Sequence, residues 1–104
     1  MKVLLNTDNY VSGNEEKNAP LIEMVSKELS RFSDQITRVE IHLSDENGYK
    51  TGKNDKKCVI EARLEGLQPV AVTNLADSHY DAVKGASEKL KSALDSMIGK
   101  LRNY

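Results

Sequence analysis

The last third of the chain constrains the fold most, because it carries one long apolar stripe at helical spacing. Hydrophobic residues recur there every three or four positions, which is the period of a helix that buries a single face. Asp77 or Ser78 precedes the stripe and can cap the first turn of the helix. The sequence therefore predicts a long final helix that packs through Val83, Ala86, Leu90, Ala93, Leu94, Met97, Ile98 and Leu101.

The preceding residues predict a sheet and one more helix. Two segments alternate apolar and polar residues, as half-buried strands do, and two shorter β-rich segments lie nearer the chain's ends. Pro20 is tolerated in the first turn of a helix. The predicted order is β-α-β-β-β-α, with strands at residues 2–8, 36–44, 58–66 and 70–73 and a first helix from Ala19 and Pro20 to about Phe32.

Each predicted strand has only one apolar side, so both helices must pack on the same face of the sheet. We therefore expect an α+β two-layer sandwich, a four-stranded sheet with two helices on one face. Its predicted core contains Val39, Ile41, Ile60, Leu64, Leu90 and Leu94. The opposite face should be open to solvent and held by cross-strand ion pairs. Its predicted residues, none of them aromatic, are Arg38, Glu40, His42, Glu61, Arg63 and Glu65.

Length and composition favour one soluble domain over residues 1–104, with a net charge of −1. No apolar segment is long enough for a membrane span or a secretory signal, so we expect a cytoplasmic protein. Cys58 is the single cysteine and alternates inward with Ile60, which predicts a buried, inert thiol. His42 and His79 lie on different predicted elements. We expect no metal, no cofactor, no small-molecule substrate and no enzyme activity.

Two segments resemble a known family. The final helix begins Asp77-Ser78-His79-Tyr80-Asp81-Ala82-Val83 and continues with Glu88-Lys89-Leu90, and the second predicted strand is Gln35 to Leu43. Together with the order of the elements, these segments resemble the ribosome hibernation-promoting factor and ribosome-associated inhibitor family, also called the sigma-54 modulation proteins. The resemblance covers nearly the whole chain.

The resemblance implies a fold similar to that of double-stranded RNA-binding domains. It also implies a stress factor that docks on the small ribosomal subunit through 16S rRNA and blocks translation. Arg31 and Lys89 match cationic positions of the family. Lys84 and Lys91 are seven residues apart and project in nearly the same direction, with Lys89 beside that line. The predicted rRNA-binding residues are therefore Arg31, Lys84, Lys89 and Lys91.

A second hypothesis stays open. Glu28, Ser92 and Ser96 stand at positions where members of the family commonly carry Lys or Arg. Fewer cations weaken binding to phosphate. The alternative is a divergent protein-interaction domain of the same fold, with weak or no rRNA binding.

Two further features carry structural expectations. We interpret Tyr80 as an anchor of the final helix against the sheet. The connection between the second and third strands contains a cationic cluster, which we interpret as a solvated loop, with an extra phosphate contact as the alternative; its members are Lys50, Lys53, Lys56 and Lys57. Asp45, Asn47 and Asp55 lie in the same stretch but lack the spacing of a calcium loop.

Overall fold

The structure is a computed structural model that describes residues 1–7, 15–46 and 55–102. Its elements follow the predicted β-α-β-β-β-α order, with one short 3-10 helix, η1, added after the first helix. They are β1 (Lys2–Thr7), α1 (Glu15–Glu28), η1 (Ser30–Phe32), β2 (Ile36–Asp45), β3 (Lys56–Leu64), β4 (Val70–Ala76) and α2 (His79–Arg102).

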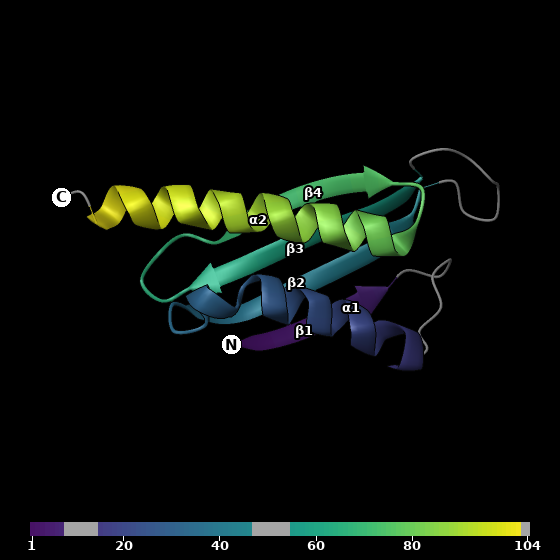
Figure 1. The fold of residues 1–104 in the computed structure, drawn as a ribbon, viewed down its shortest axis with the longest axis horizontal. Helices are drawn as coiled ribbons and strands as arrows, with labels where there is room; N and C mark the ends of the chain where they lie inside the picture. Colours follow the sequence, from purple (N-terminus) through teal and green to yellow (C-terminus); the bar gives the residue numbers. More distant parts are fainter. Residues whose placement is uncertain (8–14, 47–54, 103–104) are drawn as a thin grey trace.

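The four strands form one sheet in the order β1-β2-β3-β4. β1 pairs with β2 in parallel, and the β2–β3 and β3–β4 pairs are antiparallel. Both helices lie on the same face of the sheet, with α2 extending beyond the strands at its C-terminal end (Figure 1). The predicted two-layer sandwich is therefore confirmed.

The core lies between this sheet face and the two helices. All six residues predicted for it are buried, with exposed fractions of 5% or less. In α2, Val83, Ala86, Leu90 and Leu94 are buried, whereas Met97 and Ile98 are only half-buried. The apolar stripe of α2 thus becomes more exposed toward the C-terminal end of the helix, where α2 extends past the ends of the strands (Figure 1).

The first helix differs from the prediction at both of its ends, whereas α2 begins where it was predicted. α1 begins at Glu15, a turn before the predicted start at Ala19, and Pro20 lies inside it. Proline removes one intrahelical hydrogen bond, and the helix tolerates this loss at Pro20. α1 ends at Glu28, and Ser30–Phe32 forms η1 instead of continuing the helix. Ser78 caps α2, because its Oγ accepts a hydrogen bond of 3.1 Å from the backbone N–H of Asp81.

The open sheet face has the predicted charged residues, but the prediction of cross-strand ion pairs is wrong. The register places Arg38 opposite Arg63 and Glu40 opposite Glu61, so the directly facing residues have like charges. The ion pairs form along each strand instead, between Arg38 and Glu40 and between Arg63 and Glu61. Burial works to raise the pKa of Glu40, but the hydrogen bond from Arg38 and the nearby cations outweigh it, and the net pKa is lowered.

The side chain of Asn74 in β4 hydrogen-bonds to the backbone of α2 and lies against Gly85 of that helix. Its side-chain amide donates to the carbonyl of Ala82 at 3.2 Å and to that of Asp81 at 3.4 Å. A Cβ added at Gly85 would overlap the Asn74 amide, whereas a Cβ at Gly99 would meet nothing within 4 Å.

This contrast predicts opposite effects of the same substitution at two sites of α2. Gly99→Ala should raise the free energy of unfolding by about 0.5–1 kcal/mol, because alanine loses less backbone entropy in a helix. Gly85→Ala should lower it, because Asn74 must move and give up its hydrogen bonds to the helix. Urea denaturation of both variants tests this. Equal stabilisation by the two substitutions would show that Asn74 does not hold α2.

Candidate nucleic-acid interface

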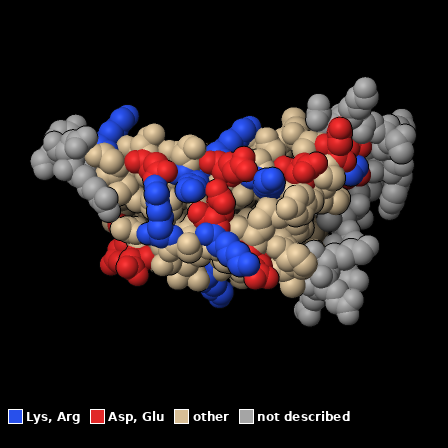
Figure 2. All heavy atoms as spheres, viewed as in Figure 1, with Lys and Arg blue, Asp and Glu red and all other residues tan. Residues whose placement is uncertain are grey.

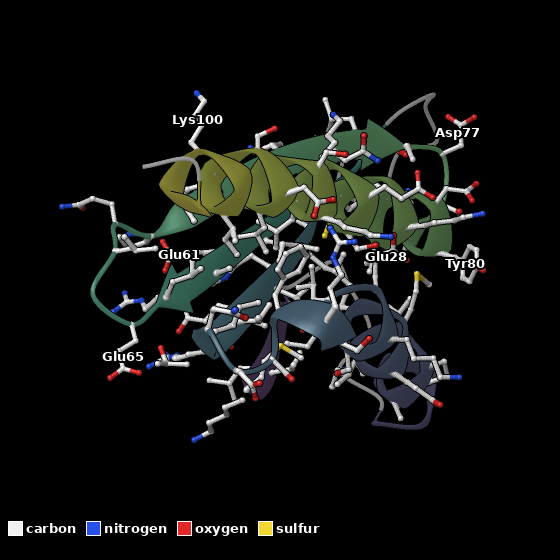
Figure 3. The ribbon with its side chains drawn as sticks, turned by 60° about the vertical axis from the view of Figure 1, so that its left-hand side comes forward. Glu28, Glu61, Glu65, Asp77, Tyr80 and Lys100 are labelled. Carbon is white, nitrogen blue, oxygen red and sulfur yellow. The ribbon has the colours of Figure 1, made fainter. Side chains whose placement is uncertain are left out.

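Two of the four predicted RNA-binding residues, Arg31 in η1 and Lys91 in α2, lie where the end of α1 and η1 meet α2. We call this contact the α1–α2 seam. We define this seam as Glu28 and Arg31 on one side and Lys91 and Asp95 on the other. Arg31 forms an ion pair with Asp95, and Lys91 Nζ lies 3.9 Å from Glu28 Oε1. The Arg31 guanidinium also lies over the Phe32 ring, 4.8 Å from its centroid. Figure 3 shows Glu28 between the two helices. Both cations are therefore held by carboxylates of this chain.

Lys84 is the least restrained of the four. Its side chain is exposed and makes no ion pair with any other residue that the structure describes. It precedes Lys91 by two helical turns, so the two side chains leave α2 in nearly the same direction. Lys84 and Lys91 therefore lie along one line, as predicted, with the α1–α2 seam at the Lys91 end.

Lys89 lies away from this line. It is five positions after Lys84, which turns it about 140° around the helix axis. Its Nζ donates a hydrogen bond of 3.0 Å to the backbone carbonyl of Thr73 in β4. The structure thus brings Arg31, Lys84 and Lys91 to one side of α2 and directs Lys89 to the sheet.

The helix face as a whole has mixed charge. Figure 2 shows Lys and Arg side chains interspersed with Asp and Glu over the two helices, without a large area of either sign. Lys27 on α1 follows the same pattern, because it pairs with Glu23 one turn earlier at 3.2 Å. An incoming phosphate must therefore compete with carboxylates for most of these cations.

The structure describes only two of the four lysines of the predicted loop cluster, Lys56 and Lys57. Lys56 belongs to β3, and its Nζ lies 3.0 Å from both Asp45 Oδ2 and Asp55 Oδ1. The hydrogen bond to Asp55 raises the pKa of Lys56 most, and the hydrogen bond to Asp45 raises it further. Lys57 pairs with Glu46 at 3.2 Å. Lys50, Lys53 and Asn47 lie outside the described residues. The two described lysines therefore join the ends of β2 and β3, and the Lys56 ammonium lies between Asp45 and Asp55.

The remaining reactive groups offer little chemistry. Cys58 is fully buried, as predicted, and burial raises the pKa of its thiol to about 12, so it stays protonated near neutral pH. Over residues 1–7, 15–46 and 55–102, no group of three or more His, Cys, Asp or Glu side chains could hold a metal ion. No helix in this part of the chain is long and apolar enough to cross a membrane.

Tyr80 differs from its predicted role. It does not pack against the sheet; it is 57% exposed at the start of α2. Its ring points outward from the N-terminal end of that helix (Figure 3). There it lines an open hollow of about 310 Å³ with residues of α1, namely Pro20, Glu23, Met24 and Lys27.

Comparison with known proteins identifies the family. The family model described as "Sigma 54 modulation protein / S30EA ribosomal protein" matches residues 9–102. The chain belongs to this family. The resemblance seen in the sequence is thereby confirmed.

Two solved structures share the fold of this S30EA-family chain. One is the N-terminal domain of Thermus thermophilus Protein Y, with a TM-score of 0.68 and 21% identity over 93% of this chain and 99% of that domain. The other is a ribosomal subunit interface protein from Coxiella burnetii, with a TM-score of 0.71 and 19% identity over 95% of this chain and 99% of that protein. At these identities the likeness concerns the fold alone.

The chain is also similar to curated proteins named FAM136A. It is 30% identical to the Xenopus tropicalis protein over 71 residues, which are 68% of this chain and 49% of that protein. It is 29% identical to the Mus musculus protein over 89 residues, which are 83% of this chain and 61% of that protein. The chain thus spans about half to three fifths of the length of these relatives.

The sequence did not identify the residues that contact the predicted RNA-binding cations. Asp95 pairs with Arg31 from a different helix, and Thr73 accepts from Lys89 across the two layers. Neither contact is local in sequence, so no spacing rule could have found it. Of these partners, the sequence indicated Glu28 alone, as an acidic residue where the resemblance implies a cation.

Proposed function

We propose that this chain binds the small ribosomal subunit through 16S rRNA and blocks translation by occupying its channel, as a cytoplasmic hibernation factor. The observation that carries the proposal is the family match over residues 9–102. The placement of Lys84, Lys91 and Arg31 on one side of the helical layer supports it. No covalent step is needed, since exclusion of other ligands is enough.

The contacts would be electrostatic. Lysine and arginine side chains bind phosphate through charge and hydrogen bonds, and arginine can bind two oxygens at once. Arg31 and Lys91 must exchange Asp95 and Glu28 for phosphate. These carboxylates are 42% and 34% exposed, so the ion pairs are screened by solvent and cost little to open. The ion pairs within the chain therefore lower the affinity for rRNA but do not prevent binding.

The alternative is a protein-interaction domain of the same fold with weak or no rRNA binding. One observation favours it: Arg31, Lys89 and Lys91 each already have a partner within the chain. A surface on which both signs alternate suits a protein with a complementary mixed surface better than a polyanion.

Binding to purified small ribosomal subunits over a series of salt concentrations separates the two. If three cations contact phosphates, the logarithm of the affinity should fall with the logarithm of salt concentration at a slope of roughly −2 to −3. Large subunits serve as the control for unspecific binding to rRNA. A flat salt dependence, or no binding to small subunits at low salt, would favour the protein-interaction domain.

A further inference from the structure

An exposed aromatic ring stands at one end of the line of cations on α2. Tyr80 precedes Lys84 by four residues, so the two side chains are neighbours on the same side of the helix. Lys84 is exposed and makes no ion pair with another described residue. Lys91 follows two turns later. The helix therefore presents a ring, then a cation, then a second cation, all on one side.

The hollow beside Tyr80 is suited to a flat ring. Pro20 and Met24 give it apolar walls, and its volume is about 310 Å³. Its two charged residues neutralise each other, because Lys27 Nζ lies 3.2 Å from Glu23 Oε1. Among the described side chains, Lys84 lies one helical turn after Tyr80 and is a cation that no ion pair occupies. A ligand that fits both features has a planar apolar group next to a phosphate.

We propose that Tyr80 and this hollow hold an unpaired nucleobase of an RNA strand whose phosphates lie along Lys84 and Lys91. The site rests on the proposed function and deepens it, since it specifies a single-stranded or bulged nucleotide instead of a continuous duplex. A base inside a duplex is already stacked, so its face is not available to the ring. Unpaired bases stack on exposed aromatic side chains without regard to sequence.

The open face of the sheet offers no comparable site. Its described side chains lack an aromatic residue, and among all described residues Tyr80 is the one exposed aromatic, because Phe32 is buried. An apolar peptide side chain could also enter the hollow, but it would leave Lys84 without an anion. Base stacking therefore accounts for more of the surface.

The first test uses tryptophan fluorescence in the full chain. The sequence contains no tryptophan, so Tyr80→Trp places a single reporter in the hollow. Leu75→Trp is the matched control, because Leu75 is 49% exposed on the open sheet face. A single-stranded RNA oligonucleotide should quench the Tyr80→Trp emission more strongly than the same sequence as a duplex. Adding Lys84→Glu should weaken that quenching, and the control should stay unquenched.

Several outcomes would overturn the inference. They are no quenching in the Tyr80→Trp variant, equal quenching in the Leu75→Trp control, or stronger quenching by the duplex. Quenching by an acidic peptide at the same salt concentration that matches or exceeds the effect of RNA would assign the hollow to a protein partner instead.

The second test measures affinity for small ribosomal subunits. Tyr80→Ala should weaken binding by roughly 5- to 150-fold, and Tyr80→Phe, which keeps the ring, should bind like the wild type. If the wild type binds and Tyr80→Ala binds equally well, the base site is wrong and the proposed function stands. If the wild type does not bind subunits but the oligonucleotide quenches as expected, the base site stands and the proposed function fails.

Discussion

Replacing Leu90 by alanine should lower the free energy of unfolding by about 2–5 kcal/mol, the usual cost of truncating a fully buried leucine. Leu90 lies near the middle of α2 and is completely buried with the core residues of the sheet. The substitution removes three side-chain carbons, Cγ and its two methyl groups, and leaves a cavity that the two layers cannot fill completely, because both are regular elements packed on each other. Urea denaturation measures the loss as a lower midpoint with an unchanged slope.

Leu75→Ala is the matched control for this prediction. It removes the same atoms from a leucine that is 49% exposed on the open sheet face. Its cost should be below about 1 kcal/mol, because little apolar surface returns to water. Similar losses for the two variants would mean that α2 does not pack on the sheet through Leu90.

The sequence predicted the layers of the fold well, because the relevant signals are local and repeated. Alternation in Ile36–Asp45 and Lys56–Leu64 gave the strands one apolar side each, and the α2 stripe gave the surface that covers them. One-sided strands leave only one way to bury both helices. The start of α1 was missed because Pro20 resembled a first-turn signal, although the helix tolerates it further inside.

The candidate site was predicted less completely. The period of the helix placed Lys84 and Lys91 in one direction. The sequence could not show that Arg31 meets Asp95 or that Lys89 meets a strand carbonyl, because both contacts depend on how separate elements pack. The like-charged facing residues of the open sheet, Arg38 with Arg63, were missed for the same reason: they depend on strand register. Side-chain type and direction can be derived from sequence here, whereas the partner of each charge cannot.

This difference matters for affinity. A line of unpaired cations would bind phosphate strongly, but here Arg31 and Lys91 start from ion pairs with Asp95 and Glu28. The proposed phosphate binding would therefore have to open two partly exposed ion pairs, each worth roughly 0–1 kcal/mol. We accordingly expect a moderate affinity for small ribosomal subunits. It should depend on the salt concentration and on the cations that lie on one side of α2, Arg31, Lys84 and Lys91.

Charge reversal on the two faces of the molecule tests this account most directly. One double variant carries Lys84→Glu and Lys91→Glu on the helical layer, and the matched variant carries Arg38→Glu and Arg63→Glu on the open sheet face. Both change the net charge equally, so a difference between them reports position and not overall charge. Unfolding curves of both variants establish that the fold is retained.

The deciding measurement is the affinity of these two variants and the wild type for purified small ribosomal subunits at several salt concentrations. The account predicts that the helix variant loses at least about tenfold in affinity and that its salt slope becomes shallower by roughly two, one for each lost phosphate contact. The sheet variant should keep a slope close to that of the wild type. A sheet variant that no longer binds, beside a helix variant that binds like the wild type, would contradict the assignment of the RNA-binding surface to the helices.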